Sequence, residues 1–203
     1  MALLTAGAAL VVTGAATAPQ QQIAAGSPPA VEAVVAAPVR DVRIVSGALP
    51  ARHASVPPVA VRIPALGVAA PVDPVGIDAA TGRFAVPQDV GRVGWYEHGP
   101  GWDAGTGAIV LAGHVDSAAQ GGGALFGLRK VKVGDLVELT APEGTVRRFR
   151  IAAVEQRHKA GLEWHDYFVR DGHPRLVLIT CGGPFNPNTR RYRDNIVVTA
   201  LAD

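Results

Sequence analysis

Three residues of this chain could together carry out nucleophilic catalysis: Cys181, His114 and Arg193. A thiolate is a strong nucleophile, an imidazole moves protons near neutral pH, and a guanidinium stays charged and can hold an oxyanion. Cys181 is the chain's only cysteine, so it can form neither an internal disulfide nor a cysteine-based zinc cluster. The thiol is therefore either an inert buried side chain or a reactive one.

Two of these residues directly follow apolar runs that read as strands. Cys181 closes the run RLVLIT (175–180) and is followed by Gly-Gly-Pro, while His114 follows the run GAIVLAG (107–113). A strand that opens into a glycine turn leaves its last side chain at a rim, with room for a substrate backbone. The alternatives are a buried core cysteine and a surface histidine, and position alone does not decide between them.

Arg193 lies just before the next apolar run, NIVVTALA (195–202). If this run and the run before Cys181 pair as an antiparallel hairpin, Arg193 returns to the neighbourhood of the thiol. The alternative is an ordinary solvated arginine, as Arg190 and Arg191 in the same loop illustrate.

The elements that must position these residues are short β-strands. The chain has 16 prolines and 24 glycines but only 5% aromatic residues, which disfavours a helical bundle. Residues 123–131 could form a short helix with Leu125, Leu128 and Val131 on one face. Strands are expected in the segments 59–68, 70–77, 107–114, 135–141, 147–157, 175–181 and 195–202. Short strands at this spacing predict one mostly-β domain over residues 57–203, a closed sheet or a sandwich.

The N-terminal region has a different composition. Residues 1–18 are uncharged and apolar, which indicates a membrane anchor or a signal segment. The first basic residue is Arg40, so the expected basic flank is missing, and we favour an uncleaved anchor. Residues 19–56 are rich in Ala and Pro and are expected to be a disordered linker. The net charge of +2, without Lys/Arg runs interleaved with aromatics, argues against nucleic-acid binding.

Three segments resemble the sortase family in the family's order: LAGHVDS (111–117), LVLITCGG (176–183) and YRDNIVVTA (192–200). The stretch LFGLRKVKVGDLVEL (125–139) is also similar to sortases, and the resemblance covers residues 60–203. The closest likeness is to class F sortases of actinobacterial type.

The resemblance implies a closed eight-stranded β-barrel with its active site at one end. By likeness, Cys181 attacks the Thr–Gly bond of an LPXTG-type sorting signal on a secreted protein and forms a thioester. An amine from a cell-wall precursor or a pilin-like protein then accepts the acyl group. His114 would shuttle protons and Arg193 would steady the oxyanion, with no metal or organic cofactor. Such an enzyme acts at the extracytoplasmic face of the cell membrane.

Further residues have weaker claims. Thr180 could touch the sorting signal, although on an ideal strand it points away from the face of Cys181. Asp116 could orient the imidazole of His114. Residues 94–102 are expected to form a turn, in which Trp95 and Trp102 pack.

Three rival interpretations remain. A metal hydrolase would use His114 and Asp116, but no second ligand cluster accompanies them. An L,D-transpeptidase would carry its cysteine in a Ser-His-Gly-Cys setting, whereas this chain has Leu-Ile-Thr-Cys-Gly-Gly. A non-catalytic wall-binding module is the third alternative. That function would not explain why His, Cys and Arg each lie in a motif that matches the sortase family.

Overall fold

The computed structural model describes residues 55–203. The expected anchor (1–18) and nearly all of the expected linker (19–56) lie outside the described residues. Within residues 55–203, no helix is long and apolar enough to cross a membrane.

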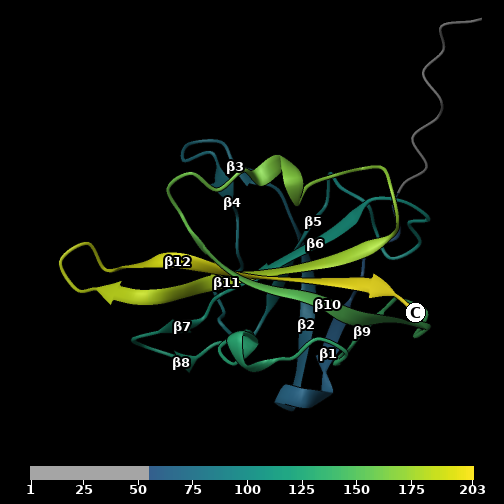
Figure 1. The fold of residues 1–203 in the computed structure, drawn as a ribbon, viewed down its shortest axis with the longest axis horizontal. Helices are drawn as coiled ribbons and strands as arrows, with labels where there is room; N and C mark the ends of the chain where they lie inside the picture. Colours follow the sequence, from purple (N-terminus) through teal and green to yellow (C-terminus); the bar gives the residue numbers. More distant parts are fainter. Residues whose placement is uncertain (1–54) are drawn as a thin grey trace, which may run out of the picture. The chain divides into compact units, whose positions relative to one another are not determined.

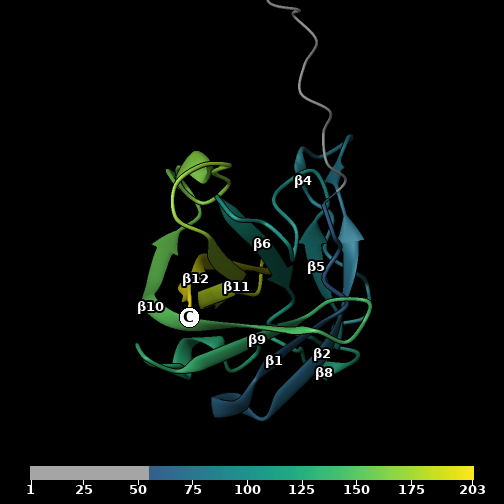
Figure 2. The same ribbon diagram turned by 90° about the vertical axis from the view of Figure 1, so that its right-hand side faces the viewer.

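The described chain forms a closed barrel of eight strands, in the order β1-β2-β5-β6-β11-β12-β10-β9 (Figures 1 and 2). This confirms the mostly-β closed fold. The barrel strands are β1 (Ala60–Ile63), β2 (Val68–Val75), β5 (Val93–Tyr96), β6 (Ala108–Gly113), β9 (Leu136–Thr140), β10 (Val146–His158), β11 (Arg175–Asn186) and β12 (Arg191–Ala202). Short elements are β3 (Ile77–Asp78), β4 (Arg83–Phe84), β7 (Asp116–Ser117), β8 (Gly121–Gly122) and the 3-10 turns η1 (Pro64–Leu66), η2 (Leu128–Lys130) and η3 (Trp164–Asp166).

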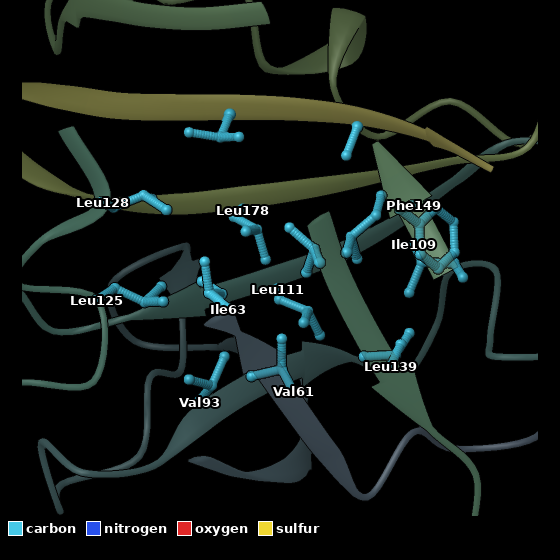
Figure 3. Packing of buried hydrophobic residues seen from close by; sticks show 14 of the residues in the cluster. Val61, Ile63, Val93, Ile109, Leu111, Leu125, Leu128, Leu139, Phe149 and Leu178 are labelled. Atoms are coloured by element: carbon cyan, nitrogen blue, oxygen red, sulfur yellow. The ribbon is translucent and has the colours of Figure 1, made fainter. Parts of the chain in front are cut away.

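Alternating apolar side chains fill the barrel. Figure 3 shows Leu111 from β6, Leu178 from β11 and Phe149 from β10 pointing into one interior. Each of these three side chains is fully excluded from solvent. Strand β6 is buried on both faces, because Phe168 and the residues around it cover its outer side. A packed interior therefore fixes the strand ends that carry the candidate site.

Two expectations about local structure need correction. Residues 123–131 form only the single 3-10 turn η2 rather than a helix, although Leu125, Leu128 and Val131 are all buried in the core. The segment expected as a turn at 94–102 begins inside strand β5, which pairs with β2 and β6. Trp95 belongs to that strand and packs in the core, so barrel closure overrides the local turn signal.

The registers of three neighbouring strands decide where the candidate site forms. β6 and β11 run parallel, with Ile179 opposite Ala112. β11 and β12 form the antiparallel hairpin expected from the sequence, with Cys181 opposite Asn195. β12 also pairs with β10, where His158 lies opposite Asp194. Figure 1 shows the linked ends of β11 and β12 projecting beyond the barrel at the left.

Candidate active site

Cys181 lies where the long strand β11 leaves the regular barrel. Its neighbour Gly182 still pairs with Asp194, but the register with β12 shifts between Gly182 and Phe185. Residues 176–180 of β11 are buried, whereas Cys181 itself is half-buried. The expected strand end and glycine turn at Cys181 are therefore wrong, because β11 continues through Gly182 and Gly183 to Asn186, and the thiol lies just before an irregularity within the strand.

His114 lies beside this rim. The parallel register pairs Ile179 with Ala112, and the same register continued one residue past the end of β6 at Gly113 would bring His114 level with Cys181. A side-chain bond supports this extension, because Thr180 Oγ1 donates to the carbonyl of Gly113 at 2.8 Å. His114 is half-buried, and its imidazole makes no hydrogen bond with any residue that the structure describes. The ring is therefore not committed to another partner in this region of the chain.

Thr180 is almost fully buried, at 4% exposure. Its hydroxyl is used by the bond to Gly113, so it ties the strand that precedes His114 to the strand that precedes Cys181. Thr180 also lines the pocket beside Cys181. A structural link is thus the observed role of the hydroxyl group.

Arg193 lies one diagonal step from Cys181, as the predicted hairpin requires. Asn195 is directly opposite Cys181, and Arg193, two positions earlier on β12, shares the same face of the strand. The guanidinium is bound to its neighbour Asp194: Nε donates to Oδ1 at 2.8 Å and Nη2 donates to Oδ2 at 3.1 Å. The side chain of Arg193 is 56% exposed, whereas that of Asp194 is 4% exposed.

Asp194 is held as a carboxylate by its partners. Hydrogen bonds from Arg193 and then from Gln156, whose Nε2 lies 2.6 Å from Oδ2, lower the pKa of Asp194 to about 2. The same pairing raises the pKa of Arg193. Because a guanidinium has five N–H groups and two are used here, three N–H donors remain for a substrate.

Asp116 has a partner other than His114. Tyr192 Oη donates to Asp116 Oδ2 at 2.5 Å, and within residues 55–203 no hydrogen bond joins Asp116 to His114. This bond, followed by burial, raises the pKa of Tyr192. Asp116 belongs to β7, which in Figure 1 lies below the projecting hairpin that carries Tyr192. The bond therefore joins the loop after His114 to β12 near Arg193.

A pocket of about 250 Å³ opens beside the thiol. Its apolar walls include Phe126 and Ile196, and its polar groups include Arg129 and Gln156. The full lining consists of Val115, Phe126, Arg129, Gln156, Thr180, Cys181, Gly182, Gly183, Tyr192 and Ile196. A mixed lining of this kind suits a short peptide segment that presents its backbone to Cys181.

Sequence reasoning missed Lys159, whose Nζ donates to Cys181 Sγ at 3.3 Å. It also missed Asp194 and Tyr192. The β10–β12 register sets both the buried position of Asp194 beside Arg193 and the place of Lys159 directly after β10. That register joins segments that are distant in sequence, so no local sequence pattern predicts it.

No group of three or more His, Cys, Asp or Glu side chains among the described residues could hold a metal ion. His114 and Asp116, the pair that a metal hydrolase would need, therefore lack further ligands in this part of the chain.

Solved structures of sortases share this fold. Sortase C from Clostridium perfringens SM101 superposes with a TM-score of 0.51 at 17% identity, over 71% of this chain and 68% of that one. Sortase C1 from Streptococcus suis gives 0.56 at 17% identity, over 74% of each chain. Streptococcus agalactiae sortase C1 gives 0.53 at 21% identity, over 71% of this chain and 66% of that one. At these identities the likeness concerns the fold.

No curated protein matches the sequence. The family model described as the sortase domain matches residues 61–203, which span the whole barrel from β1 to the C-terminal residue and include His114, Cys181 and Arg193. The chain therefore belongs to the sortase family, whose members are cysteine transpeptidases.

Proposed function

We propose that this sortase cleaves the Thr–Gly bond of LPXTG-type sorting signals through a Cys181 thioester and transfers the acyl group to an amine. The observation that carries the proposal is the parallel pairing of β6 with the part of β11 that leads to Cys181. The register ends at Ile179 and Ala112, and its extension by two residues, supported by the Thr180–Gly113 bond, would bring His114 level with Cys181. A nucleophile and a proton carrier at one barrel rim are what thioester chemistry requires.

The proposed reaction begins when His114 takes the proton of the Cys181 thiol. The sulfur then attacks the carbonyl carbon of the scissile bond, which forms a C–S bond and an oxyanion. When the oxyanion collapses, the C–N bond breaks and His114 gives its proton to the leaving amine. The incoming amine attacks the thioester, loses a proton to His114 and releases the cysteine.

Arg193 is proposed to steady the oxyanion. Its bidentate bond to Asp194 fixes the plane of the guanidinium without using all of its donors. Donors held in place before the reaction lower the barrier more than donors that must reorganise. Asp194 and Gln156 therefore act as positioning residues for Arg193.

The class F assignment and the cellular setting belong to the same proposal. The sequence motifs support class F, and the apolar segment 1–18 supports anchorage at the extracytoplasmic face of the membrane. The proposed substrates are secreted proteins with C-terminal sorting signals, and the proposed acceptors are amines of cell-wall precursors or pilin-like proteins. Thr180 and Asp116 are proposed to support the site through their bonds to Gly113 and Tyr192.

The test is incubation of the full 203-residue chain with an LPXTG peptide, with and without an added amine. Mass spectrometry should find cleavage between Thr and Gly, a thioester on Cys181, and the amine adduct when the amine is present. Cys181→Ala should abolish all three products, and His114→Ala should abolish turnover. His165→Ala is the matched control, because His165 is 76% exposed and, among residues 55–203, pairs only with its neighbours Glu163 and Asp166.

If the wild-type chain leaves a panel of sorting-signal peptides intact, the transpeptidase proposal is wrong for these substrates. An unreactive thiol in the same experiment would favour the binding-module alternative.

A further inference from the structure

The group in contact with the nucleophilic sulfur is a lysine ammonium. Lys159 Nζ lies 3.3 Å from Cys181 Sγ, and no other side-chain hydrogen bond to this sulfur occurs within residues 55–203. Arg193, the arginine of the sortase motif, directs two of its nitrogens to Asp194. The sulfur is thus in contact with Lys159 and not with the arginine of the motif, and the sequence motifs do not account for this contact.

The fold holds Lys159 in place through its backbone. Lys159 is the first residue after β10, and its N–H donates to the carbonyl of Arg193 at 3.2 Å, which extends the β10–β12 ladder by one step. The register on that ladder pairs His158 with Asp194 and Arg157 with Asn195. Lys159 thus lies opposite Arg193 at the end of the ladder.

The strand registers also give Lys159 and Cys181 a common face. Arg157, Asn195 and Cys181 lie in one row across β10, β12 and β11, and side chains opposite each other on a ladder project to the same side. Lys159 is two positions after Arg157, so it projects to that side as well. Its four-carbon chain then spans β12 to reach the sulfur, which is the geometry seen.

The carboxylates near the thiol are committed elsewhere. Asp194 is bonded to Arg193 and Gln156, and Asp116 is bonded to Tyr192. Lys159 makes no salt bridge with a residue in the described part of the chain, so its charge is not neutralised there. An ammonium group beside a thiol favours the thiolate over the neutral thiol.

We propose that Lys159 is the charge partner of Cys181, and that its ammonium group stabilises the thiolate that attacks the substrate. This inference rests on the proposed function, because it assigns Lys159 a role in that reaction. When the thiolate forms, the thiol proton passes to His114 and Lys159 keeps all three of its own protons. When the C–S bond forms, the negative charge leaves the sulfur and the ammonium is released from it. Arg193 then remains available for the oxyanion.

The charge near the sulfur can be measured without any substrate. Iodoacetate is an anion and iodoacetamide is neutral, and both alkylate the same thiolate. We expect Lys159→Gln to lower the iodoacetamide rate by about fivefold, the effect of an ion pair near a protein surface. The iodoacetate rate should fall further, so the iodoacetate-to-iodoacetamide rate ratio should fall by about threefold. Raising the salt concentration should shrink this difference.

Two further variants separate charge from shape. Lys159→Arg keeps the cation and should restore most of both rates. Lys132→Gln removes an exposed lysine that precedes β9 and is the matched control for net charge, so it should leave the rate ratio unchanged. With the peptide substrate, Lys159→Gln should lower kcat and leave KM nearly constant, because the sulfur contact is not a substrate contact.

Equal rate ratios for wild type, Lys159→Gln and Lys132→Gln would overturn the proposal, even if the peptide is cleaved and Cys181→Ala is inactive. In that case the transpeptidase function stands and Lys159 has no role in it. If Lys159→Gln changes alkylation as expected but no peptide is cleaved, the charge partner survives and the proposed substrate class fails.

Discussion

Replacement of Thr180 by Val tests the link between the two strands that carry the nucleophile and the proton carrier. Valine has nearly the shape of threonine but cannot donate to the Gly113 carbonyl, which accepts from Thr180 Oγ1 at 2.8 Å. The hydroxyl is at a site of 4% exposure, so water cannot readily replace it. Loss of a buried hydrogen bond of this kind costs about 1–3 kcal/mol. For a domain of ~150 residues, about 2 kcal/mol lowers Tm by roughly 4–8 °C.

The effect on activity should exceed the effect expected from stability alone. Gly113 directly precedes His114, so loosening this bond lets the imidazole move relative to Cys181. Small displacements of reacting groups are costly, and we expect kcat to fall about tenfold with KM nearly unchanged. Loss of a substrate contact would instead raise KM.

Thr180→Ser is the matched control, because it keeps the hydroxyl and loses only a buried methyl group, at about 1 kcal/mol. The serine variant should be moderately destabilised but keep a kcat near that of wild type. Thermal unfolding and steady-state peptide cleavage, both below the unfolding range, supply the two measurements. Equal kcat values for the Val and Ser variants would refute the reasoning that the Thr180 hydroxyl positions His114.

Two other predictions concern the support of Arg193. Gly183 has a φ of +73°, and a Cβ there would overlap the carboxylate of Asp194, whereas Gly134 has a φ of +93° with nothing within 4 Å of the added atom. Gly183→Ala should therefore lower the free energy of unfolding by about 2–3 kcal/mol and Gly134→Ala by only about 1 kcal/mol, as measured in urea; equal losses would show that the overlap is relieved at no cost. Asp194, with its pKa at about 2 instead of 3.8, stabilises the fold while it is ionised, so its contribution is complete above about pH 4 and is lost as the pH falls through 2. Urea unfolding across this range should be steeper in pH for wild type than for Asp194→Asn, and identical slopes would contradict the assignment.

Much of the barrel could be predicted from local sequence because apolar runs and turn residues act locally. The runs that became β6, β10, β11 and β12 were recognisable, since β-branched and apolar residues on a pleated strand favour this conformation wherever it occurs. The hairpin of β11 and β12 could also be predicted from the sequence. Its two strands are separated by only the short loop 187–190, so chain connectivity alone returns Arg193 towards Cys181.

Local sequence misled where a segment's conformation depends on its neighbours. Residues 94–96 look like part of a glycine-rich turn, yet pairing with β2 and β6 makes them a strand. Residues 123–131 carry apolar residues at helical spacing, yet the core accepts Leu125 and Leu128 from a single 3-10 turn. In both cases burial against distant strands outweighs the intrinsic preference of the segment.

By itself, the sequence determined which residue types could do chemistry and that His114 and Cys181 directly follow buried apolar runs. Only the tertiary structure decided what lies next to the sulfur. Thr180 meets Gly113 across 67 positions of sequence, and Lys159 meets Cys181 because β12 lies between β10 and β11. Register between distant strands is set by barrel closure and core packing as a whole, so the partner of a side chain at a strand end is a property of the fold and not of its own segment.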